Sequence, residues 1–189
     1  SFATLAKRRN YGWFVEGRGN INQRLFVIGG VGFENHAVFE YETVPRLSVA
    51  FYARQPSSVS AVGATKLMFN IGEGIKAPTV SDDRSSLFSL LSGLPNGQDL
   101  LNQFDIDRIG PERIRTLDVG IEQTFWGGRI RTGVSYFNNS NKDLIEFVSS
   151  NVLPQLGVPQ DVASSIGFGA TVNSSSFDAQ GWEFFTDLS

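Results

Sequence analysis

The sequence predicts an all-β fold, an antiparallel up-and-down meander of about seven strands. Apolar and polar residues alternate with period two over several segments, and glycine-containing turns separate them. Aromatic residues make up 12% of the chain and glycines number 20, which favours strands and tight turns over helices. No apolar run approaches the ~20 residues of a membrane-spanning helix, so a membrane location would have to rest on strands.

The clearest predicted hairpin joins Arg113–Phe125 to Arg129–Phe147. Its first strand places Leu117, Val119, Ile121 and Phe125 on one face, opposite Thr116, Asp118, Gly120, Glu122 and Thr124. Its return strand places Ile130, Thr132, Val134 and Tyr136 opposite Arg131, Gly133, Ser135 and Asn139. Between the two strands, Gly127 and Gly128 supply the positive φ angles of a tight turn.

The remaining predicted strands show the same alternation. Their apolar faces carry, in chain order, Tyr11, Trp13 and Val15, then Leu25, Val27, Val31 and Phe33, then Leu47, Val49, Phe51 and Ala53, then Leu67, Phe69 and Ile71, and finally Trp182, Phe184 and Leu188. Phe26 and Ile28 blur the pattern in the second strand, and Phe185 weakens it in the last. Each strand therefore has one apolar and one mostly polar face.

Connection and strand lengths favour part of a large transmembrane β-barrel. Short connections are expected near Gly19–Gln23, Gln55–Gly63 and Trp126–Gly128, and long ones near His36–Val44, Ile75–Glu112 and Ser149–Gly167. Outer-membrane barrels alternate short turns with long external loops in this way. The predicted hairpin strands also exceed the five or six residues usual in a sandwich, whereas a barrel strand needs ~9–11 residues to cross the bilayer. A short helix is expected around Ser86–Leu91 in the longest loop.

Composition removes several classes of function. The net charge of −3 and the lack of a basic stripe argue against nucleic acid as a partner. The absence of cysteine excludes disulfides, thiolate metal sites and cysteine catalysis. His36 is the only histidine and no Gly-x-Ser-x-Gly elbow accompanies it, so no catalytic residue, cofactor or metal ligand is predicted, and the protein is not expected to be an enzyme.

Three further patterns have structural interpretations that we prefer. Gly72–Ala77 matches a dinucleotide fingerprint, but Pro78 follows at once and suits a strand exit better than the required helix. The acidic pairs Asp82-Asp83 and Asp105-Ile106-Asp107 lack the spacing of a calcium loop and are interpreted as solvated loop charge. His36 is interpreted as a polar loop residue at a strand end.

Particular blocks of the sequence then resemble the barrel of TonB-dependent outer-membrane receptors. They are Asn10–Glu16 leading to Arg24–His36, Val44–Phe51, Gly74–Thr79, Ile109–Arg113 followed by Leu117–Glu122, Val134–Asn138 with Lys142–Ile145, and Ala179–Glu183. The blocks follow one another in family order and cover nearly the whole chain.

The resemblance implies that residues 1–189 form a partial barrel domain, with no plug domain and truncated at both ends. Family barrels have about twenty-two strands around a plug, which about seven strands cannot enclose. The intact protein would then take up a scarce nutrient, such as a metal chelate, a cobalamin-like molecule or a glycan, across the outer membrane of a Gram-negative-type bacterium. Its partners would be outer-membrane lipid, TonB, the plug and the nutrient.

The resemblance also assigns a role to one polar set. Inward-facing residues would line the lumen and contact the plug without forming a ligand site; they are Arg46, Lys66, Asn70, Asp118, Glu122 and Arg131. Ligand would be held by the external loops, where no sequence pattern identifies a ligand-binding residue. The competing hypothesis is a soluble β-sandwich that binds glycans, with the apolar faces packed against a second sheet.

Overall fold

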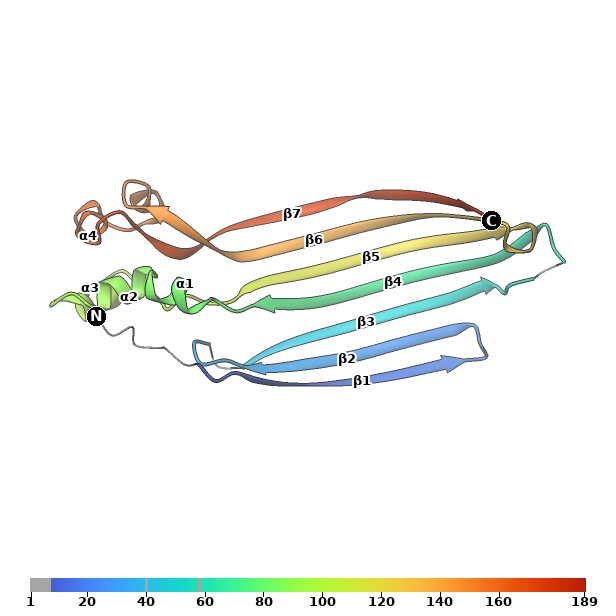
Figure 1. Cartoon of the computed structure of the whole chain (residues 1–189), viewed down its shortest axis with the longest axis horizontal. Coiled ribbons are helices and arrows are strands. Elements are labelled where there is room, and N and C mark those ends of the chain that lie inside the picture. Colours follow the sequence, from blue (N-terminus) through green and yellow to red (C-terminus); the bar gives the residue numbers. More distant parts are fainter. Residues whose placement is uncertain (1–7, 40, 58) are drawn as a thin grey trace.

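The computed structural model describes residues 8–39, 41–57 and 59–189, and its strands form a single antiparallel sheet in sequence order (Figure 1). The strands are β1 (Tyr11–Ile21), β2 (Leu25–Asn35), β3 (Tyr41–Arg54), β4 (Val62–Lys76), β5 (Glu112–Phe125), β6 (Ile130–Ser149) and β7 (Gly169–Leu188). The sheet does not close on itself, because β1 and β7 each pair with one neighbour only. The predicted seven-stranded meander is confirmed.

The turn end of the sheet is built from tight connections. Asn22 and Gln23 both have positive φ angles, and Arg24 donates to the carbonyl of Ile21 at 3.0 Å, which is the geometry of a type I′ hairpin turn. At the β5–β6 hairpin, the 3₁₀ segment η1 (Trp126–Gly128) connects the two strands. Gly127 and Gly128 have the predicted positive φ angles there.

The opposite end carries the two long loops and every α-helix found in the described residues. The β4–β5 loop contains α1 (Val80–Arg84), α2 (Leu87–Ser92) and α3 (Gly97–Gln103), and the β6–β7 loop contains η2 (Leu153–Leu156) and α4 (Gln160–Ser165). In Figure 1 these helices lie together beyond the strand ends, while the C-terminus lies at the turn end. Among the described residues, none of the helices combines the length and hydropathy needed to cross a membrane.

One predicted long connection is wrong. The stretch His36–Val44 was expected to be a loop, but β2 ends at Asn35 and β3 begins at Tyr41, so this connection is shorter than the β3–β4 connection between Arg54 and Val62. The pairing of Glu34 with Glu42 and of Gly32 with Val44 explains the difference, since the ladder continues close to the ends of both strands.

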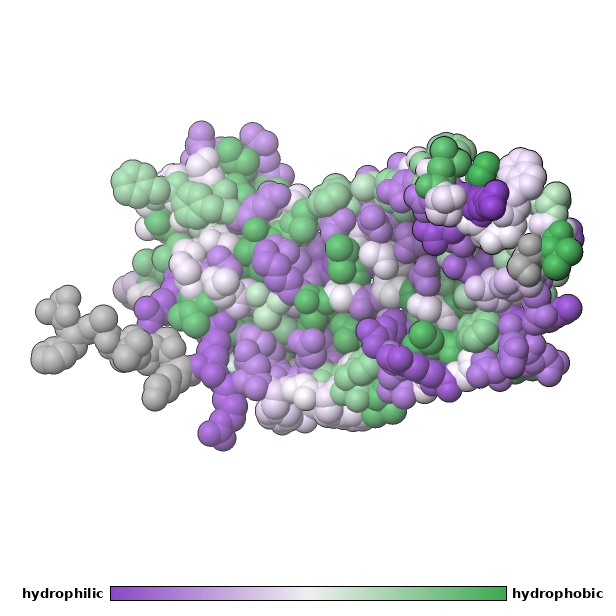
Figure 2. Space-filling view, turned by 45° about the vertical axis from the view of Figure 1, so that its right-hand side comes forward, coloured by the Kyte–Doolittle hydropathy of each residue, from purple (hydrophilic) through white to green (hydrophobic). Residues whose placement is uncertain are grey.

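The apolar face of the sheet is exposed rather than packed. Val119, Ile121 and Phe51 keep 45%, 40% and 40% of their surface accessible, although they lie on central strands. The described residues form no second sheet that could cover this face, so the sandwich alternative is excluded. Figure 2 shows hydrophobic side chains exposed among hydrophilic ones on the surface in view.

Candidate ligand-binding loops and polar face

The β4–β5 loop folds into three short helices because its sequence supplies their caps. The Thr79 hydroxyl accepts from the Asp82 backbone N–H, and the Asp82 carboxylate accepts from the Thr79 N–H at 2.8 Å, which makes a capping box for α1. Ser86 caps α2 by accepting from the Ser89 N–H at 3.1 Å. The predicted helix around Ser86–Leu91 is confirmed, whereas α1, α3 and α4 were not predicted.

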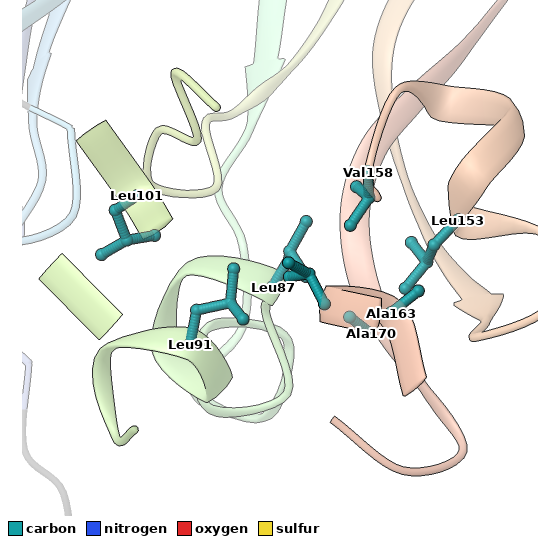
Figure 3. Packing of buried hydrophobic residues seen from close by; sticks show 8 residues of the cluster. Leu87, Leu91, Leu101, Leu153, Val158, Ala163 and Ala170 are labelled. Carbon is teal, nitrogen blue, oxygen red and sulfur yellow. The ribbon is translucent and has the colours of Figure 1, made fainter. Parts of the chain in front are cut away.

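The only extensive hydrophobic core in the described residues lies between the two long loops. Leu87, Leu91 and Leu101 come from the β4–β5 loop, and Leu153, Val158, Val162, Ala163 and Ala170 come from the β6–β7 loop and the start of β7. Figure 3 shows the side chains of the two loops directed toward each other, with Leu87 beside Ala163 and Ala170. Leu91 and Leu153 have no accessible surface, so the loops form one packed unit. We call this unit the loop cap.

Backbone contacts join the loop cap to the N-terminal end of β7. Ser86 forms a parallel bridge with Thr171, and the Thr171 N–H donates to the carbonyl of Ser85 at 2.8 Å. Thr171 already pairs with Phe147 of β6, and a strand has only two edges. Ser85 and Ser86 therefore occupy the outer edge of β7 at Thr171.

A second fastening joins Asn173 to the segment before β5. Its Oδ1 accepts from the Gly110 N–H at 2.7 Å, and its Nδ2 donates to the carbonyls of Gly110 at 3.2 Å and Asp143 at 2.6 Å. One amide side chain on β7 thus joins the segment before β5 to β6.

A cavity of ≈ 390 Å³ opens beside these contacts. Its wall combines an apolar part, including Phe104, Ile109 and Leu156, with the polar side chains Asp105, Asp107, Arg108 and Asn173. The Arg108 guanidinium lies over the Phe88 ring, 5.3 Å from its centroid. Cavities of this size, with an apolar wall and a few polar groups, are typical of small-molecule sites.

The polar face of the sheet carries ion pairs that run from strand to strand. Glu122 of β5 lies 3.6 Å from Lys66 of β4 and 3.9 Å from Arg131 of β6, and Arg131 lies 2.7 Å from Asp187 of β7. On the same polar face, near the β1 edge of the sheet, Glu16 of β1 forms ion pairs with both Arg18 and Arg46. The register places all six residues of the predicted inward-facing set on this one face: Arg46, Lys66, Asn70, Asp118, Glu122 and Arg131.

The other candidate residues have structural roles. His36 stacks on Phe39 with ring centroids 4.7 Å apart, as a loop residue at the end of β2. Gly72 to Lys76 lies in β4, so no helix opens at the glycine pattern. Asp82 caps α1 and Asp83 lies 2.7 Å from Arg8, so both acids do more than carry solvated charge. Asp105 and Asp107 line the cavity, and the described residues contain no group of three or more candidate metal ligands.

Comparisons with known proteins agree with this geometry. A family model described as TonB dependent receptor-like, beta-barrel, matches residues 1–189. The chain resembles the crystal structure of the siderophore receptor PirA from Pseudomonas aeruginosa, with a TM-score of 0.61, 16% identity and coverage of 95% of this chain and 28% of that one. The crystal structure of the siderophore receptor PirA from Acinetobacter baumannii gives a TM-score of 0.58 and 15% identity, with coverage of 96% of this chain and 26% of that one.

A third solved structure, the copper transporter OprC, gives a TM-score of 0.51 and 20% identity, covering 94% of this chain and 26% of that chain. A search of curated proteins finds no match. At these identities the structural likeness shows the fold. The chain spans roughly a quarter of the length of each solved structure, between 26% and 28%.

Proposed function

Because the chain belongs to the β-barrel family of TonB-dependent receptors, we propose that it forms part of the wall of an outer-membrane transporter that takes up a scarce nutrient. In this proposal the bacterium is of the Gram-negative type, the energy comes through TonB, and the barrel carries out no bond chemistry. The observation that supports it best is the exposed apolar face, because lipid is the solvent in which such a face is stable.

The apolar face has a boundary that crosses the strands obliquely. Going toward the loop end, the next outward-facing position is polar after Phe33, Pro45, Ile71, Leu117, Tyr136 and Trp182 on β2 to β7 in turn, and on β1 the apolar positions extend to the end of the strand at Tyr11. Tyr136 and Trp182 are paired with each other, and following the paired residues from strand to strand across the sheet leads from them to Gly19 on β1. On β1 the boundary at Tyr11 is eight residues beyond Gly19.

This drift corresponds to the strand tilt of a membrane barrel. Eight residues at ~3.4 Å each give a displacement of about 27 Å, over six strand spacings of ~4.8 Å or about 29 Å. The boundary therefore runs at about 40–45° to the rows of paired residues, and a horizontal membrane surface requires the strands to tilt by that angle. Strands of outer-membrane barrels tilt by about 35–45°.

The unpaired outer edges of β1 and β7 support a larger, closed barrel. In lipid an unpaired edge leaves backbone donors and acceptors without partners, and closure removes that cost. We propose that further strands continue the sheet on both sides, with the polar face toward the lumen and a plug domain. A further strand beside β7 would pair with the part of β7 that follows Thr171 in the sequence. At Thr171 itself the outer edge is already occupied by Ser85 and Ser86.

In the same proposal the loop cap faces outward from the cell and takes part in ligand capture. The ≈ 390 Å³ cavity beside Arg108 and Asn173 supports this assignment. A metal chelate, a cobalamin-like molecule and a glycan all remain candidates for the nutrient, and similarity to receptors named for siderophores and copper favours metal acquisition.

Tryptophan depth tests the membrane assignment. Trp13 and Trp182 lie on the outward face close to the boundary, although Trp13 is six residues beyond the row that contains Trp182. Single-tryptophan forms of the full-length protein, reconstituted in vesicles with brominated lipids, should place both indoles at the same depth near the headgroups. A difference of about 20 Å, expected for untilted strands, or no quenching at all would contradict the proposal.

A further inference from the structure

A groove of ≈ 590 Å³ crosses β3 to β7 on the outward face, directly beyond the apolar boundary. The strand register places most of its side chains on the outward face, above Ile71 and Leu117 where that face turns polar. If the apolar face lies in lipid, as the proposed function holds, the groove lies at the level of the headgroups in the outer leaflet. Its position alone therefore selects a lipid headgroup as the neighbour.

The two central strands of the groove carry three cations. Arg113 of β5 pairs in register with Lys142 of β6, so two positive charges lie directly opposite each other, and Arg115 is the next outward residue of β5. Like charges directly opposite on paired strands destabilise a sheet. An anion between them would convert this repulsion into attraction.

Two of the three cations form no ion pair within 4.0 Å among the described residues. Arg113 is held by Glu42 at 2.5 Å and approached by Asp143 at 3.8 Å. Arg115 and Lys142 are exposed and form no ion pair with any residue that the structure describes. They occupy diagonal positions on neighbouring strands, a separation of about 7–8 Å that long side chains can close around one group.

The acids of the groove lie on its flanks. Glu73 belongs to β4, opposite Arg115, and Asp178 belongs to β7, opposite Ser140. The central pair β5 and β6 contributes no acid to the groove: besides the three cations it supplies the apolar Ile114 and Leu117 and the polar Asn138 and Ser140. A tetrahedral oxyanion seated over β5 and β6 would meet two cations that are in no ion pair, together with hydrogen-bond donors, and both acids would lie to the side on β4 and β7.

We infer that Arg115 and Lys142 bind the phosphate of an outer-leaflet lipid headgroup, with Arg113 as a fixed third cation and the lipid's acyl chains lying on the apolar face below. The arrangement combines the two parts of a phospholipid or phosphoglycolipid in the correct order along the membrane normal. This inference rests on the proposed function, because it requires the apolar face to be embedded in lipid.

The test uses the full-length protein in phosphatidylcholine vesicles that contain diphosphoryl lipid A or the same lipid without phosphates. Lipid retained on the protein is measured by native mass spectrometry, for the parent and for a double variant with Arg115→Gln and Lys142→Gln. Two cations at about 1 kcal/mol each predict that the double variant loses the preference for the phosphorylated lipid by about thirtyfold. Arg129→Gln, which removes an exposed cation at the turn end, is the matched control and should retain the preference.

Three results would overturn the inference. The double variant could keep the preference, Arg129→Gln could lose it equally, or inorganic phosphate alone could displace the lipid, which would identify a free-phosphate site. The tryptophan depths separate this failure from that of the proposed function. Correct depths without a phosphate preference reject only the headgroup site, and incorrect depths reject both.

Discussion

Asn173 and Gly110 exchange a reciprocal pair of hydrogen bonds, although 63 residues separate them in the sequence. The amide of Asn173 reproduces the contacts that a neighbouring strand would make with Gly110, and it also donates to the carbonyl of Asp143. A side chain with one acceptor and two donors is needed for this bridge. This bridge between the segment before β5 and strands β6 and β7 therefore depends on one residue type at one position.

Asn173→Ala should loosen the segment around Gly110, which connects the loop cap to β5. The substitution leaves the Gly110 N–H and two carbonyls without their partners, at a cost of about 1–3 kcal/mol for groups shielded from water. Hydrogen exchange of the Gly110 amide should become about tenfold faster or more. Asn96→Ala is the control, because Asn96 is exposed in the same loop and its side chain does not cap α3. Equal protection of Gly110 in both variants would show that the bridge contributes nothing.

Leu153→Ala should destabilise both long loops together. Leu153 belongs to the β6–β7 loop but packs in the core it shares with Leu87 and Leu91, with no accessible surface. Truncating a buried leucine costs about 2–5 kcal/mol. Protease should then cleave the β4–β5 loop faster, although that loop is unchanged in sequence. Leu156→Ala is the matched control, since Leu156 lies in the same 3₁₀ segment and is 47% exposed. Faster cleavage of the β6–β7 loop alone would disprove the shared core.

The strands were predictable because their signal is local. The alternation from Leu117 to Phe125 and the Gly127-Gly128 turn are contained in adjacent residues, and both were confirmed. The blurred second strand has a physical explanation in the structure. Phe26 shares the polar face and packs edge-on against Tyr52, with ring centroids 6.0 Å apart, so a polar-face position there carries an aromatic residue.

The loop cap was not predictable in the same way. Helices of five to seven residues, such as α1 and α3, are unstable alone and owe their existence to packing against distant segments. The contacts that decide it, Leu87 with Ala170 and Gly110 with Asn173, join segments that no local pattern connects. The short connection near Gly19–Gln23 was predicted and is confirmed, but its type I′ geometry at Asn22-Gln23 was not predicted, because glutamine is an uncommon residue at a positive φ.

The β2–β3 connection should become less stable as the pH falls. Burial of the imidazole, and then the charge of Arg8, lower the pKa of His36, while Glu34 acts in the opposite direction. Because the folded pKa lies below the unfolded value of about 6.5, the unfolded connection binds more protons between the two values. The stabilisation is therefore complete above the unfolded pKa and is lost as the pH falls through the folded pKa.

Hydrogen exchange of the Val38 amide measures this effect, after correction for the intrinsic pH dependence of exchange. The Val38 N–H donates to Nδ1 of His36 at 3.4 Å, a contact that protonation of Nδ1 removes. Protection should fall with pH in the parent, and His36→Gln should make the profile flat. His36 is the only histidine, so a pH profile that persists in His36→Gln would assign the effect to another group.

Arginine substitutions on the two faces of β5 should differ in cost if one face meets lipid. Val119 lies on the apolar face and Thr116 on the polar face, where its neighbours in register are Gly72 and Asn139. Val119→Arg should lower the free energy of unfolding by about 1–2 kcal/mol, because Val119 is the first outward position inside the boundary at Leu117, between the bilayer midplane and the interface. Thr116→Arg should cost less, because the opposing glycine leaves room and the face is hydrated. Unfolding of the full-length protein in vesicles by guanidinium gives both values. Equal costs would mean that both faces of the sheet meet the same solvent, and the assignment of the apolar face to lipid would then be wrong.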